Sequence, residues 1–156
     1  MKERWKMPEI KIDRLTHDRV EDIYRIEKEC FKDPWSKKSI DEEINREISC
    51  FLILLVDGET AGYLNFWNIL GESSINRVAV SKKYRRQGLA YKLLQEIFLK
   101  SKELCITDFY LEVRKSNISA IKLYEKCGFY KTGLRKNFYD DGEDALLYTK
   151  KFPQFD

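Results

Sequence analysis

The sequence predicts an α+β (mixed α/β) fold, in which about four helices cover a mostly antiparallel sheet of seven strands. Two observations carry this prediction. Hydrophobic periodicity divides the 156 residues into the order strand, two helices, three strands, helix, strand, helix and two strands. The third helix joins two strands, and such a unit brings its strands parallel through a right-handed crossover. We expect one domain over residues 1–156, with its core in residues 10–151.

Local signals place the boundaries of the first elements. The first strand alternates apolar and polar residues. Asp18 and Glu21 resemble a capping box at the start of the first helix. Pro34 interrupts the chain, and Ser36 can cap the second helix. The predicted strands cover residues 10–15, 50–56, 60–70, 74–80, 108–113, 129–138 and 145–150, and the predicted helices cover residues 18–31, 36–45, 88–102 and 117–127.

The later boundaries follow from turn residues. Asp57-Gly58 and Gly71 separate the three middle strands, which are apolar and rich in β-formers. The third helix begins directly after Gly88 and repeats apolar residues at helical spacing. Gly128 is well placed to end the fourth helix. The last two strands form a hairpin around residues 140–142.

Composition excludes several classes of protein. The longest apolar run, residues 51–56, is far too short to cross a bilayer. The charged start, residues 1–6, has no apolar stretch of a signal peptide, so we expect a cytoplasmic protein with no membrane partner. The net charge of +3 comes from nearly balanced acids and bases, which argues against direct nucleic-acid binding. We expect a monomer or a weak dimer.

The cysteine and histidine content limits the possible chemistry. The four cysteines are far apart and form no Cys-x-x-Cys pair, so we expect buried free thiols, with neither a zinc site nor a disulfide framework. His17 is the only histidine, and it lies in a polar segment near a helix start, which does not favour a Ser-His-Asp or Cys-His centre. The cysteines are Cys30, Cys50, Cys105 and Cys127.

A short basic loop between a strand and a helix is the most informative motif. The pattern Arg85-x-x-Gly88-x-Ala90 follows an apolar strand and opens a helix. Backbone N–H groups and a helix N-terminus converge at such a junction and bind phosphate. Gly88 lets an anion approach the backbone, and Arg85 and Arg86 add positive charge. The pattern alone is also compatible with a solvated basic turn that merely starts a helix.

Three separated motifs together resemble a known family. Residues 78–90 have the form Arg/Gln-x-x-Gly-x-Gly/Ala after an apolar strand, which is similar to the acyl-CoA-binding motif of the GNAT superfamily of N-acetyltransferases. Residues 111–117 and 120–129 look like the second half of that domain. Residues 31–36, FKDPWS, are similar to the RimI-type ribosomal-protein-alanine N-acetyltransferases. The resemblance spans residues 10–150 and implies the GNAT fold.

This resemblance implies acetyl-CoA as co-substrate and no metal. The end of the strand before the loop would bind the pantetheine arm through backbone groups, like an added strand. The loop and the start of its helix would cradle the pyrophosphate, and Asn117 would contact the cofactor arm. The implied cofactor-binding residues are Val78, Ala79, Val80, Arg85, Arg86, Gln87, Gly88, Leu89, Ala90, Tyr91 and Asn117.

Glu112 is the candidate general base. Acetyl transfer to an α-amine requires loss of a proton from a group whose free pKa is about 7.7–8.0. Period-two alternation places Glu112 and Arg114 on one face of their strand. A carboxylate in an apolar sheet is costly unless it is paired or functional, and burial would raise its pKa. The residues alone are equally compatible with an ion pair to Arg77 or Arg114, and the resemblance implies the base.

Tyr124 is the candidate general acid. The leaving thiolate must gain a proton, and a neutral phenol can donate one. On its helix, however, Tyr124 is also compatible with a core aromatic beside Ala120 and Leu123. The resemblance implies the acid. A covalent route through Cys105 or Cys127 has no nearby base in the sequence, so direct transfer is preferred.

Two aromatic and acidic segments, residues 31–36 and 137–144, are predicted to shape the acceptor groove. Aromatic rings pack against a peptide, and carboxylates attract a cationic terminus. The second segment is also compatible with an ordinary acidic hairpin turn. The candidate substrate-binding residues are Phe31, Pro34, Trp35, Tyr139 and Asp140.

Three functions are therefore weighed. The resemblance implies acetylation of a protein N-terminus, with the N-terminal alanine of a small-subunit ribosomal protein as the expected target. The first alternative is an acetyltransferase for a small amine, such as a polyamine or an aminoglycoside, or for lysine side chains. The second is a non-catalytic acyl-CoA-binding or ribosome-associated module.

Overall fold

The computed structural model describes residues 6–153. The ends of the predicted domain, residues 1–5 and 154–156, lie outside the described residues. The strands are β1 (Ile10–Arg14), β2 (Ser49–Val56), β3 (Glu59–Ile69), β4 (Glu72–Val80), β5 (Asp108–Arg114), β6 (Tyr130–Arg135) and β7 (Ala145–Lys151). The helices are α1 (Val20–Cys30), α2 (Lys37–Asn45), α3 (Leu89–Leu99) and α4 (Ile118–Lys126), with short 3₁₀ turns η1 (His17–Arg19) and η2 (Lys82–Tyr84).

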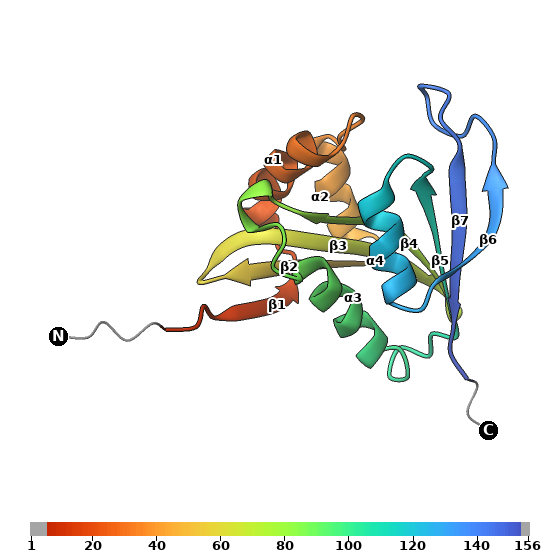
Figure 1. Ribbon diagram of the computed structural model, residues 1–156. Helices are drawn as coiled ribbons and strands as arrows, with labels where there is room; N and C mark the ends of the chain where they lie inside the picture. Colours follow the sequence, from red (N-terminus) through yellow and green to blue (C-terminus); the bar gives the residue numbers. More distant parts are fainter. Residues whose placement is uncertain (1–5, 154–156) are drawn as a thin grey trace.

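The seven strands form one sheet in the order β1-β2-β3-β4-β5-β7-β6 (Figure 1). Only β4 and β5 run parallel, and α3 lies in the crossover between them. Every other neighbouring pair is antiparallel. The predicted α+β fold, its mostly antiparallel sheet and its parallel pair are therefore confirmed.

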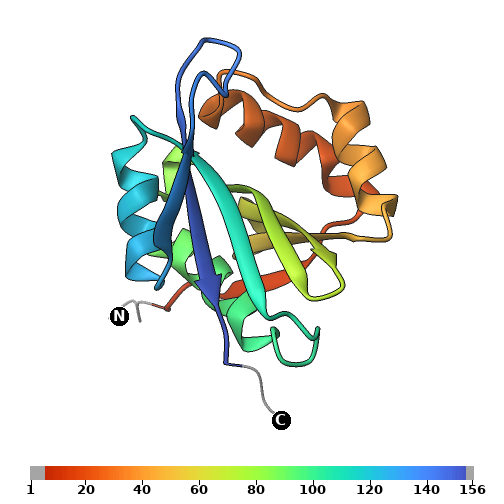
Figure 2. The same cartoon turned by 90° about the vertical axis from the view of Figure 1, so that its right-hand side faces the viewer.

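Helices cover the sheet unequally, and this leaves one part of a face open. Helices α1 and α2 pack on one face against β2, β3 and β4, and α3 and α4 pack on the other face (Figure 2). Two apolar cores result, one on each face. The larger includes Leu64, Phe66, Leu93, Ile97 and Phe109, and the smaller includes Ile23, Ile26, Ile40, Phe51 and Tyr63. On the α1/α2 side, β5, β7 and β6 extend beyond the helices (Figure 2).

A β-bulge in β4 separates two neighbouring strands. Asn65 of β3 pairs with Arg77, but Phe66 pairs with Ile75, so Asn76 is the extra residue. The pairing of β4 with β5 ends at the same point, at Ile75 and Leu111. A bulge bends a strand and increases its twist. The two parallel strands consequently diverge, and the rest of β4 has no strand partner on this side.

The start of α1 corrects one prediction. The chain forms the 3₁₀ turn η1 first, and the N-cap of α1 is Arg19, which makes no side-chain cap. Asp18 instead accepts a hydrogen bond from the Thr16 hydroxyl, so the predicted capping box does not form. The cap of α2 is confirmed, because the Ser36 hydroxyl accepts a hydrogen bond from the Ser39 N–H at 3.0 Å.

Two further expectations concern the burial of the cysteines and membrane-spanning segments. All four cysteines are free thiols. Cys127 is buried and Cys30 and Cys50 are half-buried, but Cys105 is exposed, so burial was wrong for this residue. Within residues 6–153, no helix is long and apolar enough to span a membrane.

Candidate active site

The predicted phosphate loop has the backbone that its sequence requires. Arg86 and Gly88 adopt left-handed conformations, with φ of 63° and 72°. Gly88 is the N-cap of α3. The first N–H groups of any helix lack intrahelical partners, and here they face the loop. A Cβ on Gly88 would meet no heavy atom within 4 Å, so glycine is required for its φ rather than for packing.

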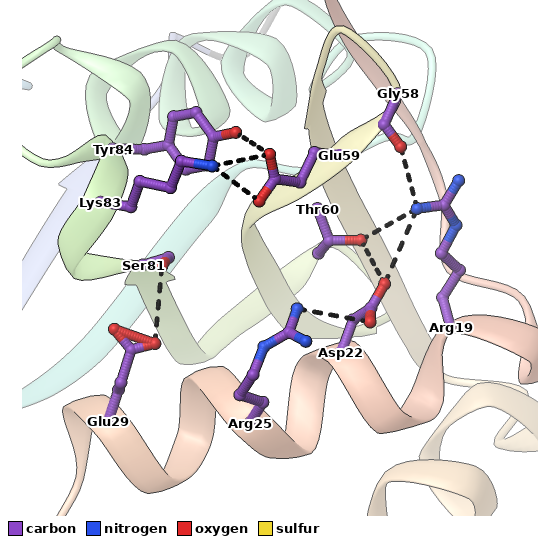
Figure 3. A network of polar contacts seen from close by, with 10 residues as sticks. All are labelled: Arg19, Asp22, Arg25, Glu29, Gly58, Glu59, Thr60, Ser81, Lys83 and Tyr84. Atoms are coloured by element: carbon purple, nitrogen blue, oxygen red, sulfur yellow. Dashed lines mark hydrogen bonds and ion pairs between the residues drawn. The ribbon is translucent and has the colours of Figure 1, made fainter.

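Carboxylates on two neighbouring elements hold the start of this loop (Figure 3). Glu59 accepts from the Lys83 ammonium at 3.0 Å and from the Tyr84 hydroxyl. Glu29 of α1 accepts from the Lys82 backbone N–H at 3.0 Å and from the Ser81 hydroxyl at 3.5 Å. The loop is therefore anchored to the start of β3 and to α1 before it reaches Gly88.

Beyond Ile75, the end of β4 has no strand partner on the side of the diverging β5 within residues 6–153. The Ser81 N–H donates to the Ala61 carbonyl at 2.8 Å. Because hydrogen-bonded and non-hydrogen-bonded pairs alternate in an antiparallel ladder, the backbone groups of Val78 and Val80 point away from β3. An extended ligand with amide groups fits such an edge. The Val80 carbonyl accepts from the Arg85 guanidinium at 3.3 Å, so the Arg85 side chain lies at the strand end.

A groove of about 1390 Å³ crosses the gap between β4 and β5. Its walls come from both faces of the sheet. Helix α4 contributes Tyr124 and its cap Asn117 from one side, whereas β5 contributes Glu112 from the other. The remaining wall includes Phe31, Trp35, Arg77, Val78, Arg135, Tyr139 and Asp140. The structure thus brings nearly all predicted catalytic and substrate-binding residues to one groove. Pro34 is exposed in the same loop and does not line the groove.

Glu112 lies on the open face of β5. Phe109, Leu111 and Val113 are buried on the opposite face, as the alternation predicts. The Glu112 side chain itself is 36% exposed, so the expected burial is wrong. Its ion-pair partner is Arg135 of β6, at 3.6 Å. Arg77 and Arg114, the partners proposed from the sequence, bind other carboxylates.

Tyr124 is both a core aromatic and a groove residue. Its ring packs edge-on against Phe129 at a centroid distance of 5.8 Å. Burial raises the pKa of Tyr124 well above that of a free phenol, and the neighbouring Tyr139 and Cys127 add to this rise. The hydroxyl therefore stays protonated. Within residues 6–153 it has no hydrogen-bond partner, so its proton is available to a ligand in the groove.

Asn117 has a structural role that the sequence did not reveal. It is the N-cap of α4, and its side chain accepts a hydrogen bond from the Ala120 N–H at 3.2 Å. This cap fixes the start of the helix that carries Tyr124. Its predicted contact with the cofactor arm stays a prediction.

The acidic hairpin, residues 137–144, forms ion pairs with cations from β5 and from the loop after α1. Asp141 and Glu143 both accept from the Arg114 guanidinium, at 2.9 and 3.0 Å. The same guanidinium lies 4.0 Å from the Tyr139 ring centroid. Lys32 reaches Asp141 from the opposite wall, at 3.4 Å. Two of the predicted acceptor-attracting carboxylates are therefore neutralised, whereas Asp140 still lines the groove.

Sequence reasoning missed the roles of Arg77 and Arg135. Arg77 pairs with Glu27, which is distant in the sequence, and Arg135 pairs with Glu112, which lies on a non-adjacent strand. No local sequence pattern therefore identifies either pair. It also missed the bulge at Asn76, which has no residue signature. Among residues 6–153, no group of three or more His, Cys, Asp or Glu side chains is placed to hold a metal ion.

Comparison with known proteins identifies the family of this chain. The model of the Acetyltransferase (GNAT) family matches residues 20–129. The [ribosomal protein bS18]-alanine N-acetyltransferase of Escherichia coli (strain K12) is 33% identical over 127 residues, covering 80% of this chain and 85% of that protein. A candidate bS18-alanine N-acetyltransferase of Bacillus subtilis (strain 168) is 38% identical over 130 residues, covering 82% and 86%.

A solved structure extends the similarity to the whole fold. The crystal structure of the ribosomal-protein-S18-alanine N-acetyltransferase from Escherichia coli superposes with a TM-score of 0.87 at 30% identity, and the match covers 95% of this chain and 97% of that one. The family model and these relatives each span most of the chain. The chain therefore belongs to the GNAT family and is an acetyltransferase.

Proposed function

We propose that the protein transfers an acetyl group from acetyl-CoA to the N-terminal α-amine of a protein. The observation that carries this proposal is the groove through the gap between β4 and β5. It gives an acceptor on the open face a direct path to a thioester lying along β4. The backbone edge at Val78 and Val80, which pairs with no other strand within residues 6–153, and the α3 N-terminus suit the two polar parts of coenzyme A.

Residues on opposite sides of the gap suit the two proton transfers. Glu112 accepts the proton that the amine loses as its nitrogen bonds to the acetyl carbon. Tyr124 donates a proton to the sulfur as the carbon–sulfur bond breaks. The thioester supplies the activated acetyl group, and backbone N–H groups near Val80 stabilise the charge that develops on its oxygen. Direct transfer requires no covalent enzyme intermediate.

The acceptor walls favour a polypeptide over a small amine. The groove extends beyond Glu112 over β5, β7 and β6, where it includes Tyr110 and Thr149, and it also reaches Trp67 of β3. A polyamine or a sugar would occupy only a part of it. The names of the relatives point to a protein α-amine, and to the N-terminal alanine of ribosomal protein bS18. We propose an N-terminal alanine of a small-subunit ribosomal protein as the acceptor.

A transfer assay distinguishes the possible acceptors. Radiolabelled acetyl-CoA is offered with peptides that begin with alanine, the same peptides with a blocked N-terminus and internal lysines, polyamines, and aminoglycosides. We expect label on the free alanine peptides alone. Label on the blocked peptides or the small amines would contradict the proposal, as would cofactor binding with no transfer to any acceptor.

A further inference from the structure

Arg77 is placed on the acceptor side of the sheet by the bulge at Asn76. Before the bulge, Ile75 faces the core under α3, and after it Val78 and Val80 face the same core. In a regular strand, Arg77 would share the face of Ile75. The inserted residue shifts the alternation, so Arg77 shares a face with Ala79 and points toward α1 and α2. Arg77 therefore connects two parts of the fold. It lies on β4, the strand predicted to bind the cofactor, and its side chain contacts the layer that contains α1.

The Arg77 guanidinium makes three contacts with one short segment, residues 31–35, which we call the acceptor loop. It lies 4.0 Å from the Phe31 ring centroid and 4.9 Å from that of Trp35. Its Nη2 donates to the Asp33 carbonyl at 2.9 Å. A planar guanidinium can stack on rings and donate in its own plane at once, which an ammonium cannot do.

A buried carboxylate completes this arrangement. The Glu27 side chain is fully buried, and its Oε1 lies 3.4 Å from the Arg77 Nε. Glu27 also accepts from the Tyr63 hydroxyl and, at 3.0 Å, from the Trp35 backbone N–H. Burial raises the pKa of Glu27, and the Tyr63 hydrogen bond and the Arg77 charge oppose that rise. Glu27 and Arg77 thus both form hydrogen bonds with the backbone of the acceptor loop.

This ion pair is poorly suited to a purely stabilising role. Buried ion pairs often contribute no more stability than well-packed apolar side chains would. In residues 6–153, the Arg77 Nε is the one buried side-chain nitrogen or oxygen without a hydrogen-bond partner. The Nε faces the Glu27 carboxylate at 3.4 Å without forming a hydrogen bond, so the geometry of this buried pair is not ideal for stability.

We infer that Arg77 is a positioning residue for the acceptor: it fixes the acceptor loop relative to β4 and so holds the bound acceptor in the groove beside the thioester. This inference rests on the proposed function, because it assigns the loop to acceptor binding. Arg77 contacts the loop rather than the reacting atoms, so its loss weakens acceptor binding without removing the chemistry.

The test compares steady-state kinetics and hydrogen exchange for Arg77→Met, Arg77→Lys and the matched control Arg14→Met, which changes an exposed arginine on β1. Methionine has an unbranched apolar side chain like the stem of arginine, but it lacks the guanidinium group. We expect Arg77→Met to raise the peptide KM at least tenfold, with the acetyl-CoA KM changed less than twofold and kcat less than threefold. Arg77→Lys should be intermediate, because it keeps the charge facing Glu27.

Hydrogen exchange provides the second measurement and needs no acceptor. We expect exchange in residues 31–36 to rise about tenfold in Arg77→Met, with residues 85–91 unchanged. Equal effects on both KM values, an unchanged peptide KM, or unchanged exchange in the loop would overturn the inference. If Arg77→Met does not fold, Arg77→Lys decides: a rise of the peptide KM without a rise of the acetyl-CoA KM supports the inference, and an unchanged peptide KM overturns it.

The two proposals fail in different ways. If the wild-type protein acetylates no peptide, the proposed function fails, and loop exchange still reports whether Arg77 fixes the loop. If the wild-type protein acetylates peptides and Arg77→Met shows a mobile loop with an unchanged peptide KM, only the positioning role fails.

Discussion

The Nε of Arg135 lies 3.6 Å from a carboxylate oxygen of Glu112, although their strands are not neighbours. Strand β7 lies between them, so the contact spans the open face of the sheet. The candidate base is therefore held in the groove by a cation from the edge strand. The contact lies on the open face of the sheet, and both the exposed carboxylate and Arg135 line the groove.

Removing the carboxylate of Glu112 tests its role as base. Glu112→Gln should lower kcat by about 100-fold or more, because general base catalysis typically contributes 10²–10⁴-fold. The pH–rate profile should change shape, and acetyl-CoA binding by calorimetry should survive. The control Glu103→Gln changes an exposed glutamate in the loop after α3. An unchanged pH–rate profile would argue against Glu112 as the base.

Arg135 is expected to act through Glu112. Arg135→Met should lower kcat in the wild-type background, because the carboxylate loses the partner that orients it. In the Glu112→Gln background the same change should have little further effect. A double-mutant cycle measures this coupling directly. Additive effects of the two changes would show that Arg135 acts independently of Glu112.

Much of the fold was predictable, because its periodicities are local. The helix α3 follows Gly88 as expected, and the alternation along β5 correctly placed Glu112 opposite Val113. The start of α1 was wrong because Asp18 satisfies a local partner, Thr16, instead of capping the helix. Side-chain hydrogen bonds of this kind compete with capping, and the sequence does not rank the two.

The charge pattern of the site was less predictable, because it depends on strand order. Arg114 could have paired with its strand neighbour Glu112 but binds Asp141 and Glu143 of the hairpin instead. Glu112 consequently pairs with Arg135 and stays exposed. These contacts depend on β7 lying between β5 and β6, which is a non-local feature of the chain.

Removing the hydroxyl of Tyr124 tests the proposed acid. Tyr124→Phe should lower kcat by about 100-fold, because the leaving thiolate loses its proton donor. The hydroxyl has no partner within residues 6–153, so the free energy of unfolding should change by less than about 0.5 kcal/mol. Kinetics and chemical denaturation measure the two effects. Tyr24→Phe on α1 is the control, and a large loss of stability in Tyr124→Phe would reveal a structural role.

A single methyl group at Gly88 tests the phosphate loop. The φ of 72° is costly for alanine, by about 1–2 kcal/mol, so Gly88→Ala should distort the loop and raise the acetyl-CoA KM about tenfold. Gly58→Ala is a matched control, because Gly58 has a φ of 81° and equal space for a Cβ. Both changes should lower stability similarly. An equal rise of the acetyl-CoA KM in the two variants would contradict the assignment of the loop.

His17 is the only histidine of the chain, so its titration can be measured separately from that of any other imidazole. His17 lies against Asp41 and 3.2 Å from the Asn45 amide oxygen, and these hydrogen bonds raise its pKa above 6.5. A raised pKa means that the protonated form is favoured by folding. Its contribution to stability is therefore complete below pH 6.5 and is lost as pH rises through the folded-state pKa.

Nuclear magnetic resonance of the single imidazole measures this titration. We expect a midpoint above 6.5 in the wild-type protein and a lower midpoint in Asp41→Asn. Glu42→Gln, one residue along α2, should leave the midpoint unchanged. A wild-type midpoint at or below 6.5 would show that the contact between η1 and α2 does not form in solution.

The position of the acetyl group on a peptide distinguishes an α-amine acceptor from a lysine acceptor. A peptide that begins with alanine and contains an internal lysine is incubated with acetyl-CoA and the protein, and tandem mass spectrometry locates the modification. We expect acetylation of the α-amine, at a rate about 100-fold lower in Glu112→Gln and Tyr124→Phe. Acetylation of the lysine with an unmodified N-terminus would contradict it.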